Sequence, residues 1–260
     1  TRWWAIAGGA TGSDIPFRWE EVRHGWRFIR KLWNAARFTA LNLAGYDPRK
    51  PRPALRTVDK WLLSKLARTI EEATRALEEC RFNTALSAIR DFTWHVFCDQ
   101  YIEAVKHRLY GPEGGDREAA QHTLYTALYS IIRLLAPICP HVTEEIYQRI
   151  FRSWEGHKSI HISPWPEAPE GFPDEEAERA GDVVMALIRA IRREKARRRM
   201  PLNARIELVR VFAGSEERAS MIKECEDDIK GTCKIEILEV LPGEGEGIGV
   251  EGYPGLTFAM

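Results

Sequence analysis

The stretch from Trp19 to Leu43 constrains the fold more than any other part of the chain. Its apolar residues recur at steps of three and four, a spacing that places them on one face of an α-helix. We expect this face to be buried, and its members are Val22, Trp26, Ile29, Trp33, Ala36 and Ala40. A stripe this wide and aromatic needs a partner surface, so the sequence predicts a long helix packed inside a helical bundle.

One flank of this helix combines a cation, an amide and an aromatic ring. Lys31, Asn34 and Phe38 follow one another at i, i+3 and i+7, and Arg37 lies beside them. Such a set suits an unpaired RNA base that stacks on a ring and forms hydrogen bonds close to a phosphate. The spacing also fits a Phe38 ring in the core with solvated cations around it, so the residues alone leave both interpretations open.

Further helical segments follow up to residue 166. We expect helices over residues 58–80, 83–110, 117–136 and 140–151, joined by short loops, which predicts an up-down antiparallel bundle over residues 19–166. The loop after the first helix holds three prolines and several cations. Weaker candidates for contact with an RNA backbone lie in this loop and on the first helix, and these are Arg27, Arg30, Arg49, Lys50 and Arg52.

A second, smaller domain is expected over residues 174–260. Residues 164–176 hold four prolines and an acidic end, which marks a domain boundary. Beyond it the pattern predicts a small α/β domain, with helices over 174–199 and 215–229 and strands over 204–212 and 233–241.

The end of the first helix in this domain is densely basic. From Arg189 to Arg199 there are seven cations and one glutamate. Cations favoured by a helix C-terminus explain only part of this run, so Arg193, Arg197 and Arg198 are further candidates for contact with an RNA backbone.

Charge is distributed unevenly although the formal net charge is zero. From Arg18 to Arg68 there are 13 Lys and Arg against 4 Asp and Glu, whereas from Arg210 to the end there are 5 against 11. A basic half is what a nucleic-acid-binding surface requires. A set of solvated helix faces would have the same charge, so the asymmetry favours neither interpretation.

Several classes of protein are excluded by what the sequence lacks. No apolar run approaches the roughly 20 residues of a membrane-spanning helix, and no signal peptide is visible, so we expect no membrane and a cytoplasmic location. The five cysteines show no CxxC spacing and the seven histidines no HxxxH or HExxH pair, so we expect neither zinc nor another metal site. The nearest approach to a catalytic cluster is His95 with Asp91 and Asp99, which we interpret as a helical histidine beside acids, and no catalytic residue is assigned.

Five motifs resemble the C-terminal region of valyl-tRNA synthetases, downstream of the catalytic domain. In order and spacing these are RWWAIAGGATGSDIPF, FIRKLWNAARF, FNTALSAIRDFTWHVFCDQYIEAVKHRLY, LLAPICPHVTEEIYQRIF and SIHISPWP, within residues 1–166. The remainder resembles more loosely the small C-terminal domain of archaeal-type members. Residues 1–18 then correspond to the end of an upstream domain.

The resemblance implies an anticodon-binding helical bundle of the class I synthetase type. It implies valine tRNA as the partner, no DNA, a monomer, and Lys31, Asn34, Arg37 and Phe38 as the anticodon-binding residues. The family's His-Ile-Gly-His and Lys-Met-Ser-Lys-Ser motifs are missing from these residues, so we expect the chain alone to be inactive. We also expect it to hold no cofactor. ATP and Mg would be used by the catalytic domain of the parent enzyme. The alternatives are a helical scaffold that binds proteins instead of RNA and, with less support, a stand-alone enzyme.

Overall fold

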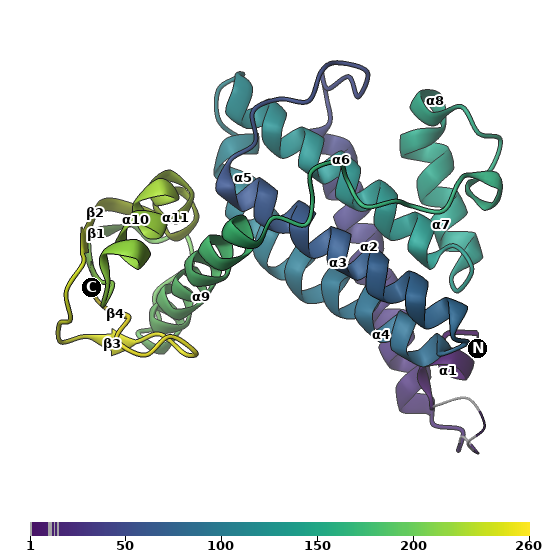
Figure 1. The fold of residues 1–260 in the computed structure, drawn as a ribbon, viewed down its shortest axis with the longest axis horizontal. Coiled ribbons are helices and arrows are strands. Elements are labelled where there is room, and N and C mark those ends of the chain that lie inside the picture. The colour runs from purple at the N-terminus through teal and green to yellow at the C-terminus, as the bar shows by residue number, and fades with distance from the viewer. Residues whose placement is uncertain (1, 10–11, 13, 15) are drawn as a thin grey trace.

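The chain folds into a helical body and a small α/β unit joined by one long helix, as a computed structural model shows (Figure 1). The structure describes residues 2–9, 12, 14 and 16–260. The expected fold class, mainly α with a small α/β part, is confirmed. No described helix has the length and apolar content needed to cross a lipid bilayer.

The helical body contains the elements up to residue 162. Its α-helices are α1 (Arg2–Ala7), α2 (Trp19–Asn42), α3 (Thr57–Glu78), α4 (Phe82–Asp91), α5 (Ile102–Leu109), α6 (Gly115–Leu135), α7 (Pro140–Ile146) and α8 (Arg152–Glu155). Between them lie the π-helices η1 (Phe92–Tyr101) and η2 (Tyr147–Phe151) and the 3₁₀-helix η3 (Ile160–Ile162). The helix expected over residues 83–110 is therefore one rod made of α4, η1 and α5.

The centre of the body is α3. Trp61, Leu62 and Leu66 of this helix are fully buried, and α3 packs against α4, η1 and α6 on the body side and against α9 on the other. Burying side chains of this size stabilises the fold by roughly 1.5–3 kcal/mol each. The central helix is therefore the part of the core that every neighbouring element shares.

The buried face of α2 differs from the predicted one. Trp26 and Trp33 are 58% and 38% exposed, and Ala40 is exposed as well. The buried side chains belong to a second stripe, which consists of Gly25, Phe28, Leu32, Ala35, Ala36, Thr39 and Asn42. Only Ala36 of the predicted stripe is fully buried, whereas Val22 and Ile29 are half-buried.

The small residues of α2 explain which stripe is buried. The indole of Trp3 lies against Gly25, where an added Cβ would come within 2.5 Å of the ring, and its centroid lies 4.7 Å from that of the tilted Phe28 ring. Glycine and alanine let the neighbouring helices approach closely, which a stripe of tryptophans would prevent. Large apolar residues at helical spacing do not by themselves identify the buried face.

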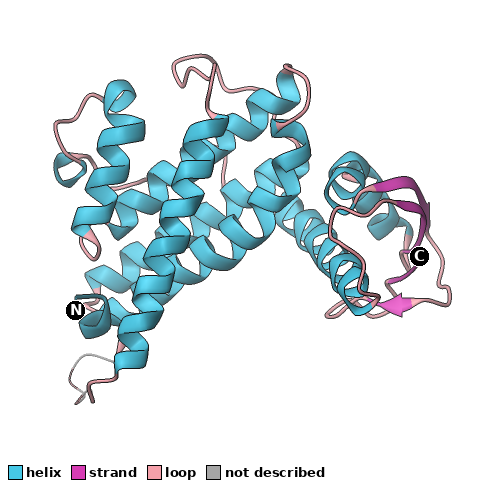
Figure 2. Cartoon of the chain, turned by 180° about the vertical axis from the view of Figure 1, so that it is seen from behind, coloured by secondary structure: helices cyan, strands magenta, loops and turns pink. Residues whose placement is uncertain are grey.

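The small unit consists of a mixed sheet with helices on one side. Its elements are α9 (Glu175–Arg197), β1 (Ile206–Phe212), α10 (Glu216–Glu224), α11 (Glu226–Cys233), β2 (Ile235–Leu241), β3 (Ile248–Gly249) and β4 (Thr257–Ala259). The strand order is β2-β1-β4-β3, with Val209 paired to Leu238 in parallel and Val211 to Phe258 in antiparallel register. Figure 2 shows the strands on the side of the unit away from the helical body. The helix expected over 215–229 is two helices, because the backbone leaves the helical conformation at Cys225.

Polar contacts along α9 attach the small unit to α3. The Trp61 indole packs against Gly181 and donates a hydrogen bond of 2.8 Å to Asp182. One turn away, Lys65 pairs with Asp182 at 2.8 Å, and Glu178 accepts hydrogen bonds from Ser64 and Arg68. The two parts of the chain therefore share an interface of side chains in fixed geometry.

A cluster of buried charges lies at the second contact between the two parts, where α11 meets α5. Arg108 donates to Asp59 at 2.6 Å, and the Tyr101 hydroxyl donates to the same carboxylate at 2.6 Å. Asp228 of α11 lies 3.7 Å from Arg108, and burial is nearly complete for all of these charges. Removing one partner of the Arg108–Asp59 pair should cost about 3–5 kcal/mol, because the remaining charge would stay buried without a partner.

Candidate nucleic-acid interface

The open face of α2 carries two of the predicted site residues without internal partners. Asn34 and Arg37 are exposed, and in the part of the chain that the structure describes neither side chain forms a hydrogen bond or an ion pair. An amide supplies both a donor and an acceptor, and a guanidinium suits a phosphate or the edge of a guanine. Both groups are therefore available to a ligand.

Phe38 is half-buried and belongs to a small aromatic pair. Its ring packs against the edge of the core and meets the Tyr110 ring edge-on, with 6.4 Å between the centroids. Tyr110 is 69% exposed, and the Lys106 ammonium lies 5.9 Å from the Phe38 centroid. Sequence analysis missed Tyr110 and Lys106, since they lie some 70 residues further along the chain and α5 alone brings them to Phe38.

Lys31 faces a different surface. Its ammonium pairs with Asp99 of η1 and lies 4.2 Å from the centre of the Trp94 ring, which in turn stacks on Phe28 at 6.4 Å. A phosphate at Lys31 would have to compete with this carboxylate. The structure thus brings Asn34, Arg37 and Phe38 to one open surface, with Lys31 at its edge and already paired.

The histidine cluster on η1 has no catalytic geometry. His95 lies 3.5 Å from Asp99, but Asp91 pairs with Arg90 and both histidine and carboxylates are largely exposed. The Asp99 carboxylate also binds Lys31, and no nucleophile is described beside the exposed imidazole. Among the described residues, no group of three or more His, Cys, Asp and Glu could hold a metal ion.

The weaker candidates on the first helix and the following loop differ in availability. Arg27 has no partner in the described ranges, and Arg30 lies 4.6 Å over the Trp26 ring. Arg49 is bound by Asp47 through two hydrogen bonds of 2.8 Å, which lower the pKa of that carboxyl to about 2. Arg52 donates to the Glu170 carbonyl at 2.9 Å. Arg27 and Arg30 are thus the more accessible cations.

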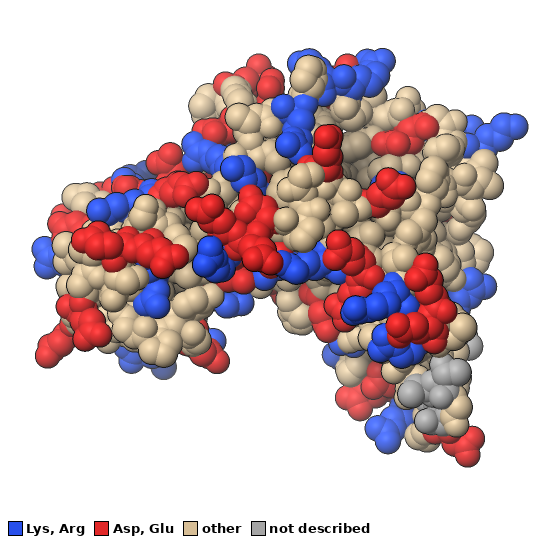
Figure 3. Space-filling model, in the orientation of Figure 1, with Lys and Arg blue, Asp and Glu red and all other residues tan. Residues whose placement is uncertain are grey.

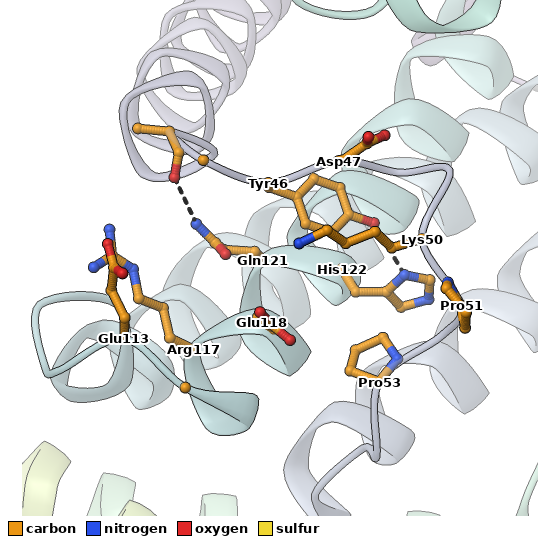
Figure 4. Close-up of a pocket in the computed structure, with 13 residues that line it drawn as sticks. Tyr46, Asp47, Lys50, Pro51, Pro53, Glu113, Arg117, Glu118, Gln121 and His122 are labelled. Atoms are coloured by element: carbon orange, nitrogen blue, oxygen red, sulfur yellow. Dashed lines mark hydrogen bonds between the residues drawn. The ribbon is translucent and has the colours of Figure 1, made fainter.

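Lys50 lines a small polar pocket at the C-terminal end of α2 (Figure 4). The pocket has a volume of about 250 Å³ and also holds Arg117 and Gln121. Gln121 donates to the carbonyl of Asn42 at 2.7 Å, which fixes the loop after α2 against α6. Asn42 donates in turn to the Phe38 carbonyl, so the pocket and the aromatic pair share one end of the bundle.

The basic helix α9 is more neutral than its sequence indicates. Arg197 and Arg198 both bind Glu194, whose pKa these hydrogen bonds lower to about 2, and Arg193 pairs with Glu251 at 3.1 Å. Lys195 is buried and donates to three backbone carbonyls, including that of Cys233 at 2.6 Å. Several cations of the run are therefore structural.

Comparison with known proteins identifies the family. The sequence profile that describes the anticodon-binding domain of tRNA ligase matches residues 59–210, which is more than half of the chain. The chain belongs to this family. Its match begins in α3 and ends in β1, so α2 precedes the matched segment. The resemblance inferred from the five motifs is confirmed.

Archaeal proteins named valine–tRNA ligase are similar to this anticodon-binding domain over nearly its whole length. The one from Methanothermobacter thermautotrophicus is 42% identical over 246 residues, covering 94% of this chain and 27% of the relative. Those from Thermococcus kodakarensis and Pyrococcus furiosus are 40% and 42% identical, each again covering 27% of the relative. The chain thus spans about a quarter of the length of the curated relatives it matches.

Proposed function

We propose that this chain is the tRNA-binding region of a valine–tRNA ligase and that the open face of α2 binds the anticodon loop of valine tRNA. The observation that carries the proposal is the surface formed by Asn34, Arg37 and the Phe38–Tyr110 pair, in a chain whose family binds anticodons. The similarity to enzymes named for valine supports the choice of tRNA.

Each group on this surface has a part that its chemistry supports. The exposed Tyr110 ring, backed by Phe38, offers a face on which an unpaired base stacks. Arg37 and Asn34 offer donors and an acceptor to base edges or phosphate. The Lys106 ammonium lies beside the ring pair and is itself bound to Glu103.

The chemistry of a valine–tRNA ligase is assigned to parts of the longer protein. We propose that valine activation, with ATP and Mg²⁺, occurs outside these 260 residues, and that the chain by itself acts as a monomeric RNA-binding unit in the cytoplasm. The family match and the partial coverage of the relatives support this division. Valine-dependent pyrophosphate exchange by the isolated chain would contradict it.

Substitutions on the surface test the binding proposal. Arg37→Ala and Phe38→Ala should each weaken binding of valine tRNA by about 1–3 kcal/mol, because the first removes a base or phosphate contact and the second removes the ring that supports the stacking face. Filter binding at fixed salt measures the loss, and Tyr110→Ala should show the same direction. Arg205→Ala, which removes an exposed arginine of the small unit, is the matched control and should bind normally. Unchanged affinity in both Arg37→Ala and Phe38→Ala would remove the proposed site.

A further inference from the structure

Tryptophan and arginine alternate along the solvent face of α2. Trp19, Trp26 and Trp33 are spaced by seven residues, and Arg23, Arg30 and Arg37 repeat at the same interval between them. Seven residues are nearly two helical turns, or about 10.5 Å along the axis, so both series lie on one side of the helix. All six residues are exposed in the structure.

The middle of this series forms a continuous surface, which we call the Trp–Arg ladder and define as Trp26, Arg30, Trp33 and Arg37. The Arg30 guanidinium lies 4.6 Å from the Trp26 centroid. The guanidinium of Arg149, from η2, lies 6.0 Å from the Trp33 centroid. Trp19 is left out, because its ring meets Phe17 edge-on at 5.1 Å at the start of the helix.

None of the four ladder residues belongs to the core of the described part of the fold. The core stripe of α2 lies on the opposite side, where Phe28 and Leu32 are buried. Leaving more than half of the Trp26 indole and over a third of Trp33 in water forgoes part of the roughly 1.5–3 kcal/mol that full burial of a large apolar side chain provides. Exposed aromatic rings rimmed by charge mark interaction surfaces.

Charge decides what kind of partner fits. Helix α2 carries five Lys and Arg, whereas its acids, Glu20 and Glu21, are confined to the first turn. Arg23 and Arg37 have no acidic partner within the described ranges. A polyanion with flat unpaired rings satisfies both components at once, since bases stack on indoles and phosphates meet guanidinium groups.

We propose that the Trp–Arg ladder stacks unpaired nucleotides of the same RNA whose loop binds at Phe38. The proposal rests on the proposed function and extends it by naming a second contact. Trp33 precedes Phe38 by five residues, about 7.5 Å along the axis, and Arg37 borders both surfaces. An RNA strand that leaves the Phe38–Tyr110 pair toward the N-terminal end of α2 meets Trp33 first and Trp26 next.

The test compares unpaired with paired RNA on the full 260-residue chain. The probes are a labelled anticodon stem-loop of valine tRNA and a fully paired duplex of the same charge, measured by fluorescence anisotropy. Trp26→Ala and Trp33→Ala should each weaken stem-loop binding about 5- to 150-fold, the equivalent of losing one stacked base. Binding of the duplex should stay within twofold, roughly the limit of the measurement.

Two controls separate stacking from other effects. Trp26→Phe and Trp33→Phe keep an aromatic face and should retain most of the affinity. Trp154→Ala removes a 41% exposed tryptophan of α8 that also lies beneath an arginine, Arg49, and should change nothing. Circular dichroism melting should show all variants folded, because the replaced rings are exposed.

Three outcomes would overturn the ladder. Normal stem-loop binding by both Trp→Ala variants, with binding lost in Phe38→Ala, would eliminate the ladder and leave the proposed function standing. Equal losses for stem-loop and duplex would show that the rings contact the backbone and do not stack on bases. A wild-type chain that binds neither the stem-loop nor valine tRNA would remove the proposed function and the ladder together.

Discussion

Lys31 lies between the Trp94 ring and the Asp99 carboxylate, at the edge of the open surface of α2. Its ammonium already has an opposite charge and an aromatic face, so an incoming phosphate gains less there than at Arg37. The neighbouring residues Asn34 and Arg37 keep their full capacity for hydrogen bonding. Within a few residues of one helix, the pairing of each side chain therefore decides which of them is available.

This difference predicts the behaviour of Lys31→Ala. RNA affinity should fall clearly less than in Arg37→Ala, because the lysine charge is neutralised in the free protein. The free energy of unfolding should drop by at most about 1 kcal/mol, as expected for a partly exposed ion pair. Parallel filter binding and thermal melting measure both quantities. A larger loss of affinity than in Arg37→Ala would show that Lys31 leaves Asp99 to bind RNA.

At the residue scale, the sequence predicted neighbours within one helix but not contacts between helices. Residue types and spacing brought Asn34, Arg37 and Phe38 together, because all three lie on one helix. The same reasoning could not find Tyr110 or the pairing of Lys31, since both depend on where η1 and α5 lie in space. The prediction that Trp26 and Trp33 are buried was wrong for a related reason. Helical spacing places large rings on one face, but it does not say whether that face or another packs against the core.

At the scale of elements, α9 and α3 form the main contact between the two units. Gly181 lets the Trp61 indole lie directly on the α9 backbone, where an added Cβ would come within 2.3 Å of the ring. The helices and strands of both units were largely predictable from periodicity. Their contact was not, because it depends on a glycine and a tryptophan that are far apart in the sequence.

Gly181→Ala should destabilise the protein. Overpacking against a fully buried indole costs about 1–3 kcal/mol, more than the gain of up to about 1 kcal/mol from replacing a helical glycine. Gly115→Ala is the matched control, because nothing lies within 4 Å of the Cβ it would add. Chemical denaturation should show a loss of stability for Gly181→Ala alone. A variant at position 181 as stable as the control would show that the α3–α9 contact is looser than described.

The same contact should make stability depend on pH. Burial by itself would raise the pKa of Glu178, but hydrogen bonds from Arg68 and Ser64 outweigh it and lower the pKa below its usual value. A lowered pKa in the folded state stabilises the protein above the unfolded-state value of about 4.3, and this contribution is lost as pH falls through the lower folded value. As pH falls below about 4.3, the free energy of unfolding should therefore drop more in the wild type than in Glu178→Gln. The free energy of unfolding of both proteins is measured as pH is lowered, and equal losses in the two would contradict the lowered pKa of Glu178.

At the scale of the whole molecule, both signs of charge occur on each unit, but each gathers in places of its own. Figure 3 shows cations gathered over the loop between α2 and α3 at the top, and a band of acidic side chains across the small unit at the left. The sequence already indicated this asymmetry. It overstated the basic character of α9, however, where Glu194 and Glu251 bind three arginines. We therefore expect RNA to approach the body along α2 more readily than the small unit.

Anticodon recognition by α2 can be measured by comparing the affinities of two tRNAs for the same 260-residue chain. One is valine tRNA, and the other is the same molecule with its anticodon replaced, so that only the loop differs. Replacing the anticodon should weaken binding by about 1–3 kcal/mol per recognised base, whereas the salt dependence, set by phosphate contacts, should stay nearly unchanged. Equal affinity for both tRNAs would contradict anticodon recognition by α2.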